Sequence, residues 1–169
     1  MVPRFHCMPA SNSAELVLLR HGIAEPRQEG RDHPDRTLTV AGRQRTQLVM
    51  AALVRRGLRL DRLLSSPYRR ALQTAELALE AGLASGLALD ERLKPGGALE
   101  TLVTAFDGRL GLVGHEPDLG DLACTLLGCP PGGLVLKKAG VIQLCRSAGQ
   151  WQVKALLRPA LLIDDLGCS

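Results

Sequence analysis

Two histidines of this sequence follow short apolar segments, and arginines stand close to them. Arg20 and His21 end one apolar run, and His115 ends another. A third apolar run leads into residues 65–70, which end in two arginines. An imidazole can attack phosphorus and hold it as a covalent intermediate, and guanidinium groups offer paired donors that match phosphoryl oxygens. These residue types therefore indicate phosphoryl transfer, in which catalysis is mostly positioning and electrostatic stabilisation.

The apolar pattern alternates between strand-like and helix-like segments. We predict strands at 15–20, 60–65, 87–89 and 110–113, helices at 40–56, 66–82, 98–105 and 117–127, and a closing hairpin of 140–146 and 151–157. Thr39 is expected to cap the first helix and Gly57 to stop it. Ser66 is expected to cap the second, with Pro67 at its first position.

Repeated alternation of strands and helices predicts a three-layer α/β/α fold with a mainly parallel central sheet. We expect one domain over residues 14–169, preceded by a loose extension of residues 1–13. Ligands bind at the carboxyl ends of the strands in such sheets, and helix amino termini there favour anions. Arg20, His21, Arg70 and His115 are therefore expected to meet at one sheet edge. Protonated near neutral pH, the second imidazole could donate to phosphoryl oxygens.

Composition excludes several other classes of protein. The formal net charge is +4, but the basic residues are scattered rather than massed, and aromatic residues make up only 2%. A nucleic-acid platform needs a basic patch or exposed rings, so no nucleic-acid partner is expected. No apolar run is long enough to span a bilayer, so no membrane association is expected. The 5 cysteines include no CxxC pair, which favours a reducing cytoplasm over a disulfide framework.

Four segments together resemble the histidine phosphatase superfamily, whose fold is that of phosphoglycerate mutase. They are LVLLRHG, LTVAGRQRT, SSPYRRALQTAE and LVGHEPDLGDL, in the order of that family, and they cover residues 15–127. RHG alone would be weak evidence, whereas four ordered matches at predicted strand–helix junctions are specific. The resemblance implies the phosphoglycerate-mutase-like α/β fold and a covalent phosphohistidine intermediate on the enzyme.

The resemblance also implies the role of each site residue. His21 matches the phosphorylated nucleophile, Arg20 a phosphate clamp and His115 the second histidine. The family's second arginine immediately precedes an alanine, so it corresponds to Arg70, while Arg69 is expected to be a surface neighbour.

Gly22 and Arg36 are predicted to contribute to substrate binding, the latter by its likeness to a pocket arginine of the smallest members. Other residues that could do chemistry receive structural interpretations. His33 is expected to be exposed in a polar loop, Trp151 to pack in a late strand, and Cys124 to be a buried, inert thiol on a helix.

The general acid of larger superfamily members is missing from this sequence. It normally follows a stretch like DERL at residues 90–93, where this chain continues with KPG at 94–96. Loss of such an acid slows ester hydrolysis, because an alkoxide leaves poorly, whereas a phosphoramidate nitrogen needs less assistance. The short bacterial phosphohistidine phosphatases resemble this chain in length and in this feature. The resemblance therefore implies hydrolysis of phosphohistidine on a protein, with no cofactor and no metal.

Two alternatives remain. A small-molecule phosphomonoesterase would take its acid from Glu25 or Glu91, and a non-catalytic phosphoprotein-binding module would use the same pocket only to bind. A mutase is disfavoured because the chain lacks long insertions that would enclose a bisphosphate.

Overall fold

A six-stranded mixed sheet forms the centre of the molecule. The computed structural model describes residues 14–104 and 106–163, so the predicted extension 1–13 lies outside the described residues. The strands are β1 (Glu15–Arg20), β2 (Arg62–Ser65), β3 (Ala88–Leu89), β4 (Arg109–Gly114), β5 (Val141–Ser147) and β6 (Gln150–Leu157). Their order is β3-β2-β4-β1-β5-β6. The first four are parallel to one another, β5 is antiparallel to β1, and β6 is antiparallel to β5.

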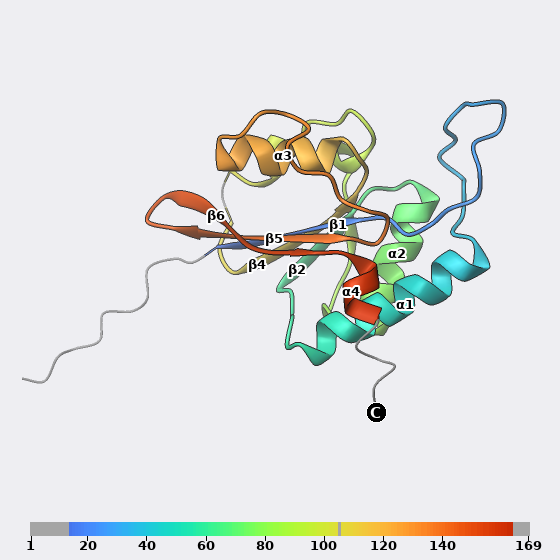
Figure 1. Cartoon of the computed structure of the whole chain (residues 1–169), viewed down its shortest axis with the longest axis horizontal. Helices are drawn as coiled ribbons and strands as arrows, with labels where there is room; N and C mark the ends of the chain where they lie inside the picture. The colour runs from blue at the N-terminus through green and yellow to red at the C-terminus, as the bar shows by residue number, and fades with distance from the viewer. Residues whose placement is uncertain (1–13, 105, 164–169) are drawn as a thin grey trace, which may run out of the picture.

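Helices cover both faces of this sheet, so the predicted three-layer α/β/α fold is confirmed (Figure 1). The helices are α1 (Val40–Arg55), α2 (Arg69–Glu80), α3 (Asp118–Leu127) and α4 (Pro159–Ile163), with short 3-10 turns at Glu91–Leu93 and Leu99–Leu102. Successive side chains of a strand point to opposite faces. Val17 and Leu19 accordingly pack in the core beside α1 and α2, whereas Leu16 and Leu18 pack beside α3.

Local sequence signals place the first helix correctly. The Thr39 side chain accepts a hydrogen bond from the Gly42 N–H at 2.9 Å and caps α1, as predicted. Gly57 follows the helix with a φ of +81°, a conformation that glycine adopts without steric cost. The predicted closing hairpin is also confirmed, with Ala148 and Gly149 at its turn.

The predicted start of the second helix is wrong. α2 begins at Arg69 with Tyr68 at the N-cap, and no side chain caps it. The Ser66 hydroxyl accepts from the Tyr68 N–H at 3.3 Å and also lies 2.9 Å from a ring nitrogen of His115. Ser66 therefore joins two strand ends instead of capping a helix.

Two other helical segments differ from expectation. The predicted helix over 98–105 forms only a 3-10 turn, in which the Thr101 and Thr104 hydroxyls donate to the carbonyls of Ala98 and Thr101. Such local bonds compete with regular helix formation. The short helix α4 has no counterpart among the predicted elements. In the described part of the chain, no helix combines the length and apolar character that a membrane span requires.

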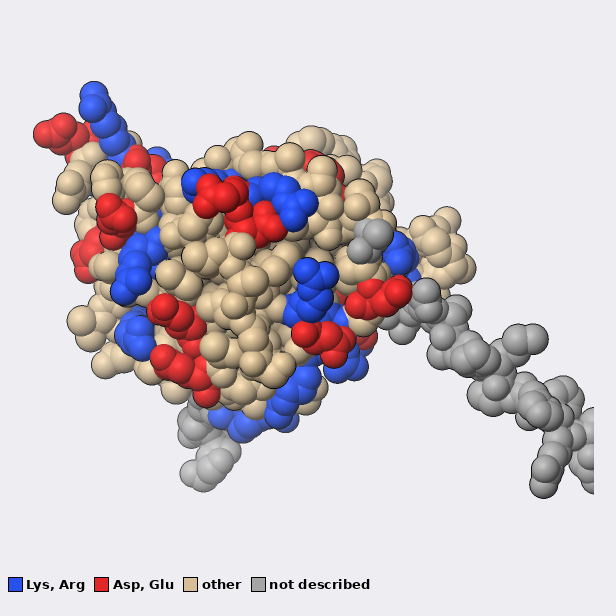
Figure 2. Space-filling model, turned by 180° about the vertical axis from the view of Figure 1, so that it is seen from behind, with Lys and Arg blue, Asp and Glu red and all other residues tan. Residues whose placement is uncertain are grey.

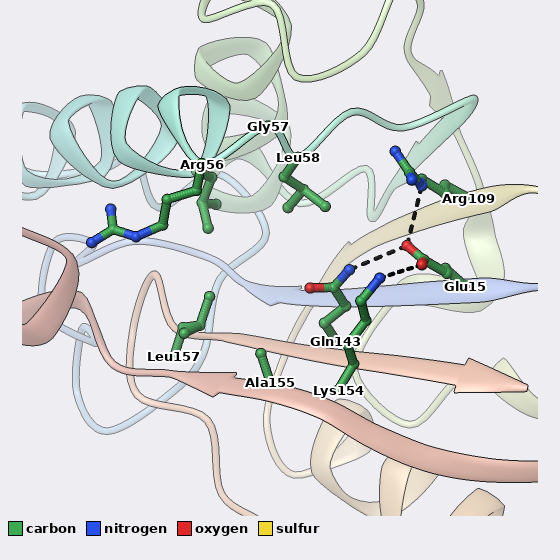
Figure 3. Close-up of a pocket in the computed structure, with 10 residues that line it drawn as sticks. Glu15, Arg56, Gly57, Leu58, Arg109, Gln143, Lys154, Ala155 and Leu157 are labelled. Atoms are coloured by element: carbon green, nitrogen blue, oxygen red, sulfur yellow. Dashed lines mark hydrogen bonds and ion pairs between the residues drawn. The ribbon is translucent and has the colours of Figure 1, made fainter.

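At the amino ends of the strands, Glu15 of β1 connects three other strands (Figure 3). Its carboxylate forms an ion pair with Arg109 of β4 at 3.1 Å, accepts from Gln143 of β5 at 3.2 Å, and also pairs with Lys154 of β6. Burial alone would raise the pKa of Glu15, but these partners outweigh it and lower the pKa. The cluster lines a pocket of about 400 Å³.

Candidate active site

The four residues predicted to act together lie around one pocket at the carboxyl ends of the strands. Arg20 ends β1, His21 follows it, Arg70 lies in the first turn of α2, and His115 follows β4. The pocket has a volume of about 840 Å³ and is lined by all four, together with Arg36. Three of them are almost fully buried, at 6% exposure for His21, 2% for Arg70 and 3% for His115.

His21 is held in one tautomer by its own backbone neighbourhood. Its Nδ1 lies 2.7 Å from the Gly22 carbonyl oxygen. Because a carbonyl only accepts, Nδ1 carries the proton and Nε2 keeps a lone pair. Arg70 donates from Nε to that Nε2 at 3.2 Å. Burial, and then the charges of His115, Arg70 and Arg20, lower the pKa of His21 to about 3 against the opposing Gly22 bond. At neutral pH the ring is therefore uncharged, and its Nε2 lone pair, which faces Arg70, is the nucleophilic one.

Arg70 connects the two histidines to the loop of residues 24–36. Its Nη2 contacts the carboxylate of Asp32 at 2.7 Å and Nδ1 of His115 at 3.3 Å, and its Nη1 donates to the carbonyl of His33 at 3.2 Å. Arg69, in contrast, is exposed. The planar fork of Arg70 thus fixes the relative positions of both rings, which a single ammonium could not do.

His115 is also neutral, which differs from the predicted protonated ring. Its Nδ1 accepts from Arg70, so the proton resides on Nε2 and is donated to the Ser66 hydroxyl at 2.9 Å. Burial and then the charge of Arg70 lower the pKa of His115 to about 3, although Asp32 opposes this. The sequence shows that arginines are near the histidine but not that both groups are buried together, which accounts for the error.

The guanidinium of Arg20 has one donor that bonds to the protein and one buried donor that does not bond to any described residue. Its Nη1 donates to the Leu136 carbonyl at 2.7 Å, which fixes the guanidinium against the loop that precedes β5. Its Nε is buried and has no hydrogen-bond partner within the described part of the chain. An unsatisfied buried donor costs about 1–3 kcal/mol. An anion oxygen in the pocket would satisfy it.

Two carboxylates of the pocket were missed by the sequence reasoning. Asp32 binds Arg36 and Arg70 together, and the two arginines lower its pKa although burial acts in the opposite direction. Glu116 is partly buried, and burial raises its pKa while Arg20 and two backbone N–H groups act against that. Asp32 stands in a polar loop with charges of both signs, so no sequence signal distinguished it. Glu116 directly follows His115, and that adjacency was the available signal.

Gly22 was predicted to contribute to substrate binding, but it lies outside the pocket lining. It is not among the residues that line the pocket, and its N–H donates to the Thr74 hydroxyl at 3.0 Å. A Cβ at this position would lie 2.3 Å from Oγ1 of Thr46. The structure therefore gives Gly22 a packing role, because a side chain here would collide with Thr46 of helix α1.

The position of the missing acid adjoins the pocket. Pro95 lines it, whereas Glu25 and Glu91 do not. Glu91 instead pairs with Lys94 on the surface. Neither glutamate that the sequence offered as a substitute acid is therefore at the site, and Glu116 is the glutamate that lines it.

His33, Trp151 and Cys124 lie in the surroundings that the sequence predicts for them. The His33 side chain is 60% exposed. Trp151 stacks on Phe106 with ring centroids 6.2 Å apart. Cys124 is buried, whereas Cys129 and Cys145 are partly buried. All three are free thiols.

Known proteins are similar to this chain in sequence and in fold. An uncharacterized protein of Picosynechococcus sp. is 40% identical over 146 residues, which span 82% of this chain and 88% of that protein. The fold is similar to that of the protein histidine phosphatase SixA complexed with tungstate, with a TM-score of 0.75, 23% identity, and coverage of 88% of this chain and 99% of SixA. A mutant phosphoserine phosphatase from Entamoeba histolytica in complex with phosphoserine matches with a TM-score of 0.64 and 17% identity, over 86% of this chain and 98% of that one. The family model of branch 1 of the histidine phosphatase superfamily matches residues 16–95, a span that contains Arg20, His21 and Arg70. The chain belongs to the histidine phosphatase superfamily.

Proposed function

We propose that this phosphatase hydrolyses phosphohistidine on a protein, through a covalent phosphoryl intermediate on His21. The observation that carries the proposal is the state of His21. Its ring is buried, neutral and fixed as the Nδ1–H tautomer, with the Nε2 lone pair facing a guanidinium donor. A neutral imidazole among cations suits attack on a phosphoryl dianion, because the cations attract the substrate and stabilise charge on its equatorial oxygens.

The reaction proceeds in two displacements. Nε2 of His21 forms a bond to phosphorus while the bond from phosphorus to the substrate imidazole breaks, and that imidazole takes its proton from solvent. Arg20 and Arg70 bind the phosphoryl oxygens, and the buried Nε donor of Arg20 gains a partner. Water then attacks phosphorus, phosphate leaves with the oxygen of that water, and the surplus proton passes to solvent. His21 returns to its neutral form.

His115 acts as the second donor to the phosphoryl group. A dianion within hydrogen-bonding distance raises the pKa of an imidazole, so phosphoryl binding favours the protonated ring. Nδ1 of His115 then gains a proton and donates to an oxygen in place of its acceptor bond with Arg70. Nε2 keeps its bond to Ser66, which holds the ring in place during this change.

The preference for a phosphoramidate rests on the wall of the pocket at Pro95. The resemblance to larger relatives leads us to expect a glutamate near this position. This chain has Pro95 at this point of the pocket wall, and a proline has no proton to give to an alkoxide. An imidazole leaving group is weakly basic and is protonated from water near neutral pH. The chemistry thus favours cleavage of a P–N bond over a P–O bond. The similarity to the SixA fold supports the same preference.

A quench experiment tests the nucleophile. The protein is incubated with ³²P-labelled phosphoramidate and denatured, and the label on the chain is measured after acid and after base. We expect label that survives base but not acid in wild type and in His33→Ala, an exposed-histidine control. We expect none in His21→Ala. Label retained by His21→Ala would reject the assignment.

A small-molecule phosphomonoesterase is the second candidate, and Glu116 is the observation that favours it. Its carboxyl group lines the pocket and has a pKa raised by burial, as a general acid requires. Glu116→Gln separates the candidates. Loss of ester hydrolysis with intact phosphoramidate hydrolysis supports an acid role for Glu116, whereas a wild type that cleaves esters readily and spares phosphohistidine would overturn our proposal. A non-catalytic binding module would show no turnover of either.

We further propose that the enzyme acts in the cytoplasm and needs no metal. The free thiols of Cys124, Cys129 and Cys145 suit a reducing compartment. Turnover is expected to survive dialysis against a chelator, and restoration of lost activity by a divalent ion would contradict the mechanism.

A further inference from the structure

A second pocket adjoins the active site and is lined by cations. It has a volume of about 490 Å³, and Arg20 and Lys138 line both pockets. The other cations around it are Arg45 of α1, Lys137 from the loop before β5, and Arg158 just before α4. Among the described residues, no acidic side chain lines it. We call this site the cationic pocket.

Four of the five cations of this pocket, all except Arg20, lack a partner among the described residues. Within residues 14–104 and 106–163, the side chains of Arg45, Lys137, Lys138 and Arg158 form no hydrogen bond or ion pair. On the face in Figure 2, by comparison, several Lys and Arg side chains lie beside Asp or Glu. Burial, together with the nearby charges of Arg20 and other arginines, lowers the pKa of Lys138. Like charges held together in this way favour the binding of an anion.

We propose that the cationic pocket binds carboxylates of the protein substrate that flank its phosphohistidine. This inference rests on the proposed function. The reacting phosphoryl group is served by buried, fixed donors such as Arg70, whereas Arg45, Lys137 and Arg158 are exposed side chains from three separate segments. Exposed, unpaired cations spread over a surface suit an acidic protein face better than one compact anion. Lys138 belongs to both pockets and makes them continuous.

Two synthetic peptides test the proposal. Both carry one histidine, phosphorylated chemically with phosphoramidate, and they differ only in having Asp and Glu or Asn and Gln around it. For wild type we expect kcat/KM to be about tenfold higher for the acidic peptide at low salt, since several exposed charge pairs each contribute modestly. The difference should shrink as added salt screens these pairs. Phosphoramidate itself reports on the reacting site alone.

Charge reversal at the cationic pocket gives the matched comparison. Arg158→Glu and Lys137→Glu are each expected to lower the preference for the acidic peptide about fivefold through KM. Turnover of phosphoramidate should stay at the wild-type value in both. Arg62→Glu is the control, because Arg62 is exposed at the first residue of β2 and lines neither pocket.

Three results would count against the inference. Equal kcat/KM for the two peptides in wild type would overturn it, as would an acidic preference that survives in both variants. If neither peptide is cleaved while a small phosphate ester is, the proposed function fails and this inference fails with it. That result differs from the first two, in which phosphohistidine is hydrolysed and only the recognition of carboxylates is absent.

Discussion

Charged groups are arranged in opposite ways at the two ends of the parallel strands. At the amino ends, one carboxylate, Glu15, connects Arg109 and Lys154 across four strands. At the carboxyl ends the pocket is lined by five cations but only two carboxylates, namely Arg20, Arg27, Arg36, Arg70 and Lys138 against Asp32 and Glu116. At the amino ends Arg109 and Lys154 both pair with a carboxylate of the fold, whereas Arg20, Arg27 and Lys138 at the carboxyl ends form no ion pair among the described residues.

The two ends also differ in whether their ionisable side chains are charged. Glu15 holds its charge in the folded state, and its pKa is lowered by its partners. His21 and His115 are instead kept uncharged among cations, with pKa values of about 3. The amino-end cluster thus stabilises the fold, while the carboxyl-end site is arranged for an anion that the fold does not itself supply. Such sites commonly reduce stability in exchange for function.

The largest effect is expected for Arg70→Lys. A lysine keeps the positive charge but loses the fork that reaches His21, His115 and Asp32 together. We expect kcat/KM for phosphoramidate to fall about 100- to 1000-fold, as for removal of an electrostatic donor from a transition state. The exposed neighbour Arg69→Lys should retain wild-type kinetics. Wild-type kinetics in Arg70→Lys would show that charge near the site, rather than the fork, is what matters.

A stability profile against pH should report the two buried histidines. Each has a pKa of about 3 in the folded protein and an ordinary value of 6.5. Unfolded chains therefore bind more protons below pH 6.5, so the free energy of unfolding falls as pH drops from 6.5 toward 3. The limiting slope is about 1.4 kcal/mol per pH unit for each histidine. Urea unfolding between pH 7 and pH 5 measures it.

One variant checks the origin of this slope. His115→Gln should remove about half of it, because one of the two titrating rings is gone. A profile that is flat down to pH 5 in wild type would mean that the rings are not held neutral.

A smaller effect is expected for Ser66→Ala. Ser66 is fully buried, and its hydroxyl accepts a hydrogen bond from Nε2–H of His115. Removal of that hydroxyl frees the ring to reorient. Ser66 is therefore a residue that positions the His115 ring. We expect kcat to fall about tenfold with little change in KM, because the bond matters most when His115 donates to the transition state. Ser65→Ala, also buried but bonded only to the Ser66 carbonyl, should keep kcat.

How much the sequence predicts depends on how local each feature is. The Thr39 cap and the Gly57 stop depend on neighbouring residues, and both were predicted correctly. The meeting of Arg20, His21, Arg70 and His115 was also predictable, because parallel strands bring their carboxyl ends to one edge.

Features that depend on distant contacts were not predictable. Ser66 matches a helix cap in sequence, but in the fold its hydroxyl is next to His115, 49 residues away. Asp32 pairs with Arg70 across 38 residues, through a loop without a periodic pattern. The neutral state of His115 depends on burial among charges from three segments. A pattern read along the chain contains the residue types at these positions but not their contacts.

The smallest effect is expected at the amino ends of the strands. Glu15→Gln removes the charge that pairs with Arg109 and Lys154, and both cations are more than 40% exposed, at 44% and 45%. We therefore expect a loss of only about 0.5–1 kcal/mol in the free energy of unfolding at pH 7. Because its pKa is lowered in the fold, Glu15 stabilises above its ordinary value of 4.5, and this contribution is lost as pH falls through the folded pKa.

The same variant tests whether the two ends are independent. Glu15→Gln should unfold with a flatter pH dependence below pH 4.5 and should hydrolyse phosphoramidate at the wild-type rate, because the cluster shares no residue with the active-site pocket. Glu80→Gln, which removes a more exposed pair with Arg43, should change stability less. If Glu15→Gln lowered kcat as much as Ser66→Ala, the charge at the amino ends would be coupled to the site through the strands. The division between a stabilising end and a ligand-binding end would then be wrong.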